Sequence, residues 1–301
     1  MKKINWAEEI RISTSKIIRN GIEELNNSGI NRDILIHNSR KRVKTIRAIL
    51  KLIKDELSGK KYKEFNLTFR NLNRRSANIR RAYVMLEIIE KERKIKSDAV
   101  SLRLLDKIKN NVEELMISTQ PKINVNQVLV QYSDLFYSFE KYFNSISFKK
   151  KDFLLLKNGF AEIYSNAKYH IKEANKSKDV VIYHELRKNV KDLSSMLEII
   201  QKAWPDVIKS YNKQLKILAD FIGEMHDLFE FNLLLDNANI PENMTKSKKL
   251  LQDELTERIH TLIIAVQELT NKIFAEKTEC FISRFENIAR FKLTKSKFHI
   301  A

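Results

Sequence analysis

Turn-forming residues are scarce in this chain, which has only five glycines and three prolines among 301 residues. A β-rich or α/β fold of this length would need many more of them at its turns. Apolar residues instead recur at helical spacing almost everywhere. Pro121, Pro205 and Pro241 fall between the apolar-periodic segments, where a missing N–H does no harm. The sequence therefore predicts an all-α protein.

The apolar periodicity also sets approximate helix boundaries. We expect helices at about 5–27, 32–57, 61–93, 98–117, 127–147, 152–174, 179–203, 206–236, 246–275 and 277–292. No segment of the chain has the alternating pattern of a convincing strand.

The sequence contains an internal repeat. The segment His37–Lys44 matches His184–Lys191 at an offset of 147, and the apolar positions that follow keep the same offset. One predicted helix further on, two more pairs follow at an offset of 146: Arg70 with Lys216, and Arg80 with His226. This period is too long for a solenoid and suits a duplicated bundle. We therefore expect two similar helical halves, residues 1–148 and 149–301.

One side of the predicted helix that begins near Asp33 is cationic. With an advance of about 100° per residue, five of its residues share about 120° of arc: His37, Arg40, Lys41, Lys44 and Arg47. The second copy has His184, Arg187, Lys188 and Lys191 on the same arc, and Ser194 where the first copy has Arg47. We expect neither face to hold an acid between its apolar boundaries. Because like charges at i+3 and i+4 repel, two matched copies of such a face indicate a site for a multiply charged anion.

The charge balance agrees with an anionic partner. The chain has 56 Lys and Arg against 38 Asp and Glu, a net charge of +18, which favours nucleic acid, an anionic membrane or another polyanion as partner. No stretch approaches the length of about 18 apolar residues that a membrane span needs. The two cationic faces lack the aromatic residues on which single-stranded nucleic acids stack. This favours an anion without bases, although binding to a duplex backbone stays open.

The histidine at the head of each face is expected to contact the anion, because a phosphate favours the protonated imidazole. Affinity should then rise modestly below about pH 6.5.

The pattern His-x-x-Arg-Lys-x-x-Lys, found on two predicted helices, resembles the CHAD domain family, the histidine-marked α-helical domains of bacteria and archaea. Further matching positions are Ile10-Arg11, Arg70 with Arg80-Arg81, Tyr164 with Lys168, and the segment 218–227. The resemblance extends over about residues 5–292. The chain departs from the family where Arg80-Arg81 replaces a frequent Arg-Asp and where Ser194 replaces an expected cation.

The resemblance implies two antiparallel helical bundles, related by an approximate two-fold axis, with a central basic groove or pore that binds inorganic polyphosphate. It also implies attachment to polyphosphate granules. The implied polyphosphate-binding residues are Arg11, His37, Arg40, Lys41, Lys44, Arg47, Arg70, Arg80, Arg81, Lys168, His184, Arg187, Lys188, Lys191, Lys216 and His226.

Catalytic motifs are weak or missing, so we expect a binding protein without cofactor or metal and not an enzyme. Glu90–Lys94 matches the Glu-x-Glu-x-Lys signature of triphosphate tunnel enzymes, but on a helix Glu90 and Glu92 point about 200° apart. His184-Glu185 lacks the second histidine of a zincin. The single cysteine, Cys280, allows no disulfide and suits a reducing cytoplasm, and we expect a buried thiol.

Three alternatives stay open. They are a protein that binds an RNA backbone, a metal-dependent polyphosphate phosphohydrolase, and a scaffold whose basic tail, Lys292–Lys297, meets an acidic protein. The oligomeric state is not indicated by the sequence.

Overall fold

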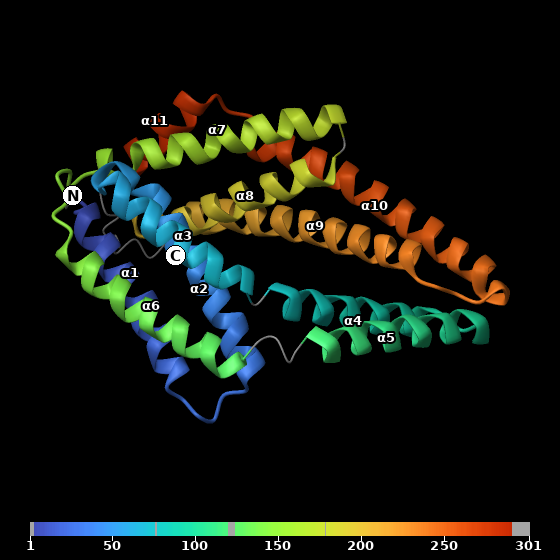
Figure 1. Cartoon of the computed structure of the whole chain (residues 1–301). Coiled ribbons are helices and arrows are strands. Elements are labelled where there is room, and N and C mark those ends of the chain that lie inside the picture. Colours follow the sequence, from blue (N-terminus) through green and yellow to red (C-terminus); the bar gives the residue numbers. More distant parts are fainter. Residues whose placement is uncertain (1–2, 76, 120–123, 178, 291–301) are drawn as a thin grey trace, which may run out of the picture.

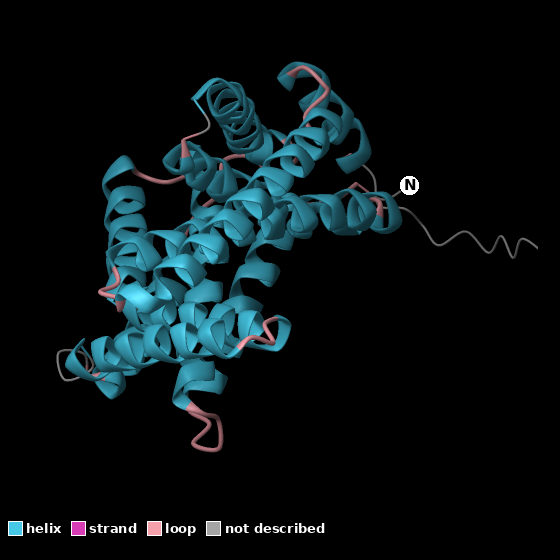
Figure 2. Cartoon of the chain, turned by 90° about the vertical axis from the view of Figure 1, so that its right-hand side faces the viewer, coloured by secondary structure: helices cyan, strands magenta, loops and turns pink. Residues whose placement is uncertain are grey.

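The computed structural model describes residues 3–75, 77–119, 124–177 and 179–290, apart from the side chains of 77–80 and 116–119. These residues form eleven α-helices and no β-strand (Figures 1 and 2), which confirms the all-α prediction. In chain order the helices are α1 (Trp6–Leu25), α2 (Arg32–Leu52), α3 (Gly59–Arg75), α4 (Ala77–Ile95), α5 (Ala99–Thr119), α6 (Val125–Ser145), α7 (Leu154–Ser177), α8 (Val180–Ile200), α9 (Pro205–Asn237), α10 (Thr245–Ile273) and α11 (Thr278–Ala289).

The elements follow the same order before and after residue 148, which lies between α6 and α7. The two motif helices, α2 and α8, are each 21 residues long. A short 3₁₀ turn follows each of them, η1 (Lys54–Glu56) after α2 and η3 (Gln201–Ala203) after α8. The long helix α9 then stands where the first half has α3 and α4. A two-fold relation between the halves stays a prediction.

The single helix predicted over residues 61–93 is wrong, because α3 and α4 occupy this stretch. Helix α3 packs against α2 and α6, whereas α4 packs against α5 and α9. Residues 71–81 include few apolar side chains, so the apolar periodicity does not indicate that one helix ends and another begins there. Near the end of α3, Nη1 of Arg40 donates to the carbonyl of Asn73, and the Tyr132 hydroxyl donates to Oδ1 of Asn73 at 2.8 Å. These tertiary contacts take up polar groups near the end of the helix.

The main apolar core runs through both halves of the chain. It includes residues from Trp6 in α1 to Ala289 in α11, and the Trp6 indole donates to the carbonyl of Ala289 at 2.9 Å. The amphipathic helix α11 turns Phe281 and Phe285 into this core. The prediction of a buried Cys280 is wrong, since its side chain is exposed and the neighbouring Phe281 takes the inward position.

A second, smaller apolar cluster joins α4 and α5 to the distal parts of α9 and α10. We call these four segments the arm; they extend to the right of the molecule in Figure 1. Among the described side chains of the arm, the fully buried ones are Ile89, Leu104, Leu105, Ile108, Phe231, Leu235 and Leu255. None of the helices described combines the length and the apolar character that crossing a bilayer requires.

Helix α7 crosses the end of α2 at very short range. A Cβ atom added to Gly159 of α7 would lie 2.4 Å from the carbonyl oxygen of Leu52 and 2.5 Å from its Cα. Only a glycine fits at this crossing, because the obstacle is backbone that cannot rotate away. Gly159 thus fixes the distance between one helix of the second half and the motif helix of the first.

We expect Gly159→Ala to lower the free energy of unfolding by about 1–3 kcal/mol, the usual cost of overpacking. Gly59→Ala is the matched control, because a Cβ atom there meets nothing within 4 Å. The control should leave stability unchanged or raise it by about 0.4–1 kcal/mol. Urea denaturation followed by circular dichroism measures both. Equal midpoints for the two variants would show that the crossing is not tight.

Candidate functional site

The two motif helices pack against each other. Helix α2 contacts α8 directly, and each buries an apolar stripe in the main core. In α2 the fully buried residues include Val43, Ile46 and Ile49, and in α8 they include Val190 and Leu193. The apolar sides predicted from the sequence are therefore confirmed, and they hold the two cationic helices side by side.

Cations from the two halves come close to each other at this contact. Burial lowers the pKa of Lys191 below the ordinary lysine value, and the positive charges of Arg187 and Lys41 lower it further, whereas Asp220 and Asp227 raise it. Lys191 belongs to α8 and Lys41 to α2. Because α2 and α8 are in direct contact, the charge of Lys41 acts on Lys191 from the neighbouring helix, although it is the weakest of these influences.

Arg47 of α2 lies next to Arg70 of α3. Burial lowers the pKa of the Arg47 guanidinium; the charge of Asp192 raises it, and that of Arg70 lowers it. Nε of Arg47 donates to Oδ1 of Asn66 at 2.8 Å, so an amide and not a carboxylate orients this side chain. The Arg70 side chain is exposed.

Asp192 of α8 lies among cations of both halves. Its carboxylate pairs with the ammonium of Lys51 at the end of α2. Burial raises the pKa of Asp192, whereas the charges of Lys51, Arg47 and Lys188 lower it. The expectation that the cationic faces hold no acid is therefore wrong. By helical geometry Asp192 lies only about 40° from Lys188. The sequence could therefore have shown that an acid borders the cationic arc of this helix.

The motif arginines Arg40 and Arg187 make equivalent contacts to backbone. Arg40 donates from Nη1 to the carbonyl of Asn73, and Arg187 donates from Nε to the carbonyl of Ala219 at 3.1 Å. Asn73 and Ala219 stand 146 positions apart, so the repeat is visible in these contacts. In α9 the guanidinium lies against Gly223, where an added Cβ would come within 2.4 Å of Nη2 of Arg187.

Arg187 also faces an acidic cleft. Burial lowers its pKa, and the charges of Asp227 and Asp220 raise it. The cleft, of about 280 Å³, lies between α4, α8, α9 and α10, and its charged residues are Glu87, Lys91, Glu92, Arg187, Asp220, Glu224, Asp227 and Arg258. Acids outnumber bases here, which disfavours a polyanion. In the described part of the chain, no three His, Cys, Asp or Glu side chains come together as a metal site.

Each motif histidine lines a pocket with an aromatic residue from the following helices. His37 lines one of about 240 Å³ with Ile34 and Tyr83. His184 lines one of about 520 Å³ at the equivalent positions of the repeat, with Val181 and Phe229 in place of Ile34 and Tyr83. The Tyr83 hydroxyl donates to Asp33 at 2.9 Å. These pockets differ from the cation cluster between α2 and α8.

His184 lies beside His226, the residue that matches Arg80 in the repeat. Their ring centroids are 5.2 Å apart. Burial lowers the pKa of His184 below the ordinary value of 6.5, and the charges of Lys188 and His226 lower it further. Nδ1 of His184 is buried and has no hydrogen-bond partner among the described residues. His184 is therefore mainly neutral at pH 7.

Four of the predicted binding residues have partners within the chain. Arg11 donates to the carbonyls of Asn144 (3.2 Å) and Ile146 at the end of α6. Nζ of Lys168 donates to the carbonyl of Glu276 at 2.6 Å.

Arg81 pairs with Glu230, and Lys216 with Glu198 at 2.8 Å. The Arg80 side chain and the tail Lys292–Lys297 lie outside the described residues.

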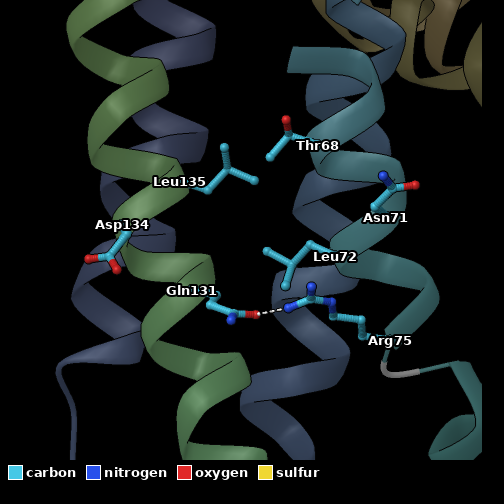
Figure 3. A pocket seen from close by; sticks show the side chains of 7 residues that line it. All are labelled: Thr68, Asn71, Leu72, Arg75, Gln131, Asp134 and Leu135. Carbon is cyan, nitrogen blue, oxygen red and sulfur yellow. Dashed lines mark hydrogen bonds between the residues drawn. The ribbon is translucent and has the colours of Figure 1, made fainter. Parts of the chain in front are cut away.

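A pocket that sequence reasoning did not predict lies between α3 and α6 (Figure 3). Its volume is about 470 Å³, and it is lined by Thr68, Asn71, Leu72, Arg75, Gln131, Asp134 and Leu135. Nη1 of Arg75 donates to Oε1 of Gln131 at 2.9 Å. With one cation and one carboxylate, this pocket lacks the charge for a polyanion. None of the four pockets described is lined by both α2 and α8, and a central groove or pore stays a prediction.

The comparisons with known proteins agree with the repeated motif. No curated protein matches the chain. The model of the CHAD domain matches residues 25–236, a shorter span than the expected 5–292. The match includes both motif helices and all but the last residue of α9. Because this match covers more than half of the 301 residues, the chain belongs to the CHAD domain family.

Proposed function

We propose that this protein binds inorganic polyphosphate, without hydrolysing it, on the surface where α2 packs against α8. We call this the cationic surface and define it by Lys41, Lys44, Arg47, Arg70, Lys188, Lys191 and Lys216. The observation that carries the proposal is the direct packing of α2 against α8, which places the cations of the two halves on adjacent helices. Membership of the CHAD domain family supports the same conclusion.

The chemistry of the surface suits a flexible polyanion. Polyphosphate has about one negative charge per phosphate, and counterion release supplies much of the affinity for such a chain, as it does for nucleic-acid backbones. Lysines act as mobile point charges, while Arg47 and Arg70 are able to grip an oxyanion through two N–H groups. Segments 37–47 and 184–194 contain no aromatic residue, so bases would gain no stacking there.

The proposed setting is the cytoplasm, at polyphosphate granules, as family membership implies. Two simple assays test the alternative functions. Release of phosphate in the presence of Mg²⁺ or Mn²⁺ would establish a phosphohydrolase. Displacement of long polyphosphate by RNA at equal phosphate concentration and physiological salt would establish a nucleic-acid binder.

Changing Lys41, Lys44, Lys188 and Lys191 together to Gln should weaken polyphosphate binding by on the order of 100-fold, because each interaction between a cation and a phosphate contributes to a steep salt dependence. The slope of log K against log salt concentration should become shallower by about 0.7–0.9 for each phosphate that is no longer neutralised. Titration of polyphosphates of defined length at several salt concentrations measures both quantities.

The matched control changes four exposed cations of the arm to Gln: Lys94, Arg103, Lys246 and Lys249. It removes the same net charge far from the cationic surface, so it should keep most of the affinity. If the two quadruple variants lose affinity equally, the binding depends on net charge alone and the proposed surface is wrong.

The pH response should depend on His184. Its pKa is lowered by burial and neighbouring cations, so its contribution to stability is complete above pH 6.5 and is lost as the pH falls below this value. His184→Gln should therefore reduce the loss of stability between about pH 7 and pH 5, measured by thermal unfolding. Bound polyphosphate favours the protonated ring, so affinity should rise over the same range in the wild type more than in the variant. Parallel pH profiles would remove His184 from the ligand-binding residues.

A further inference from the structure

We propose that polyphosphate is anchored by the first half of the cationic surface, because carboxylates of the chain itself neutralise the second half. This inference rests on the proposed function. It concerns the two motif helices, which the sequence presents as matched copies but which differ in charge. Helix α2 has seven Lys and Arg and one acid, whereas α8 has three Lys and Arg and three acids. The formal charge is thus +6 on α2 and zero on α8.

Lys41 and Lys188 occupy the same position of the repeat and have different surroundings. Nζ of Lys188 lies 2.6 Å from Oε1 of Glu185, one helical turn away on α8. Asn38 stands at the position of α2 that matches Glu185. Among the described residues Lys41 has no carboxylate within ion-pair distance, and its side chain is exposed.

Arg70 and Lys216 form a second matched pair. Nζ of Lys216 lies 2.8 Å from Oε1 of Glu198 in α8. The position of α2 that matches Glu198 is Lys51, so the sign of the charge is reversed there. Arg70 pairs with no acid within the described ranges, and its positive charge helps to lower the pKa of Arg47.

The third acid of α8, Asp192, acts on both helices. It pairs with Lys51 and attracts Arg47 and Lys188, and Thr45 holds the matching position of α2. A phosphate that approaches Lys188 or Lys216 therefore competes with Glu185 or Glu198 for these cations. Asp192 acts mainly on Lys51 and Arg47 of α2 and less on Lys188. Surface ion pairs are individually weak, so a polyanion displaces them, but each contact then yields less affinity than a contact with Lys41 or Arg70.

The decisive experiment compares two double variants with identical changes of charge at matched positions. Lys41→Gln with Arg70→Gln removes two cations of the first half, and Lys188→Gln with Lys216→Gln removes their counterparts. All four side chains are exposed, so neither variant disturbs the core. The first pair should make the salt slope of polyphosphate binding shallower by about 1.4–1.8, the value for two phosphates that are no longer neutralised. The second pair should change the slope by less than half as much.

A third variant, Glu185→Gln with Glu198→Gln, removes two competitors and keeps every cation. It should raise the affinity for polyphosphate and steepen the salt slope. An unchanged or lower affinity in this variant overturns the inference even if one of the other variants fails to fold.

The outcomes separate the two proposals. Wild-type protein that does not bind polyphosphate at low salt rules out the proposed function and the inference with it. Wild-type binding with equal reductions of affinity in the two double variants, or with the larger reduction for Lys188 and Lys216, leaves the function standing and overturns the unequal roles of the two halves.

Discussion

The packing of α2 against α8 is the interaction on which the rest of the structure depends, because it forces two cationic helices together. Burying one Leu or Ile side chain stabilises a fold by about 1.5–3 kcal/mol, and each helix buries several in a shared core. Two like unit charges about 4 Å apart repel by about 1 kcal/mol in water and by about 4 kcal/mol near a protein surface. Apolar burial therefore dominates, and the repulsion between Lys41 and Lys191 persists as a property of the surface.

The two copies of the repeat share the backbone contact that their motif arginines make. The charge that each copy presents to solvent comes mainly from its lysines. Arg40 and Arg187 both donate to a backbone carbonyl at the same place in the following helix. The first half ends α3 two residues after that carbonyl, and the second half continues α9 and makes room for the guanidinium with Gly223. Two different backbones thus accommodate the same hydrogen bond, which assigns these arginines to helix packing more than to an external ligand.

Much of the fold was predictable, because helical periodicity and the repeat are both local properties of sequence. The break between α3 and α4 was not, since it depends on which neighbours each segment finds: α2 and α6 for one, α5 and α9 for the other. The apolar sides of the motif helices were also predictable. The acids beside them were missed, because a count along one helix face does not reveal that Asp192 reaches Lys51 of a different helix, or that Glu198 reaches Lys216 of α9.

The unequal charges of the two helices also explain how they pack at all. If α8 had the +6 of α2, Lys51 would be deprived of the carboxylate of Asp192 and meet only further cations, and its half-buried ammonium would have no partner. The acids of α8 supply that partner, so their first role is in the fold. A strongly cationic α2 packs against α8 because the net charge of α8 is zero. The difference in charge between the two copies thus serves two purposes. It stabilises the packing of α2 against α8, and it makes the first half of the cationic surface the place where a bound anion gains the most affinity.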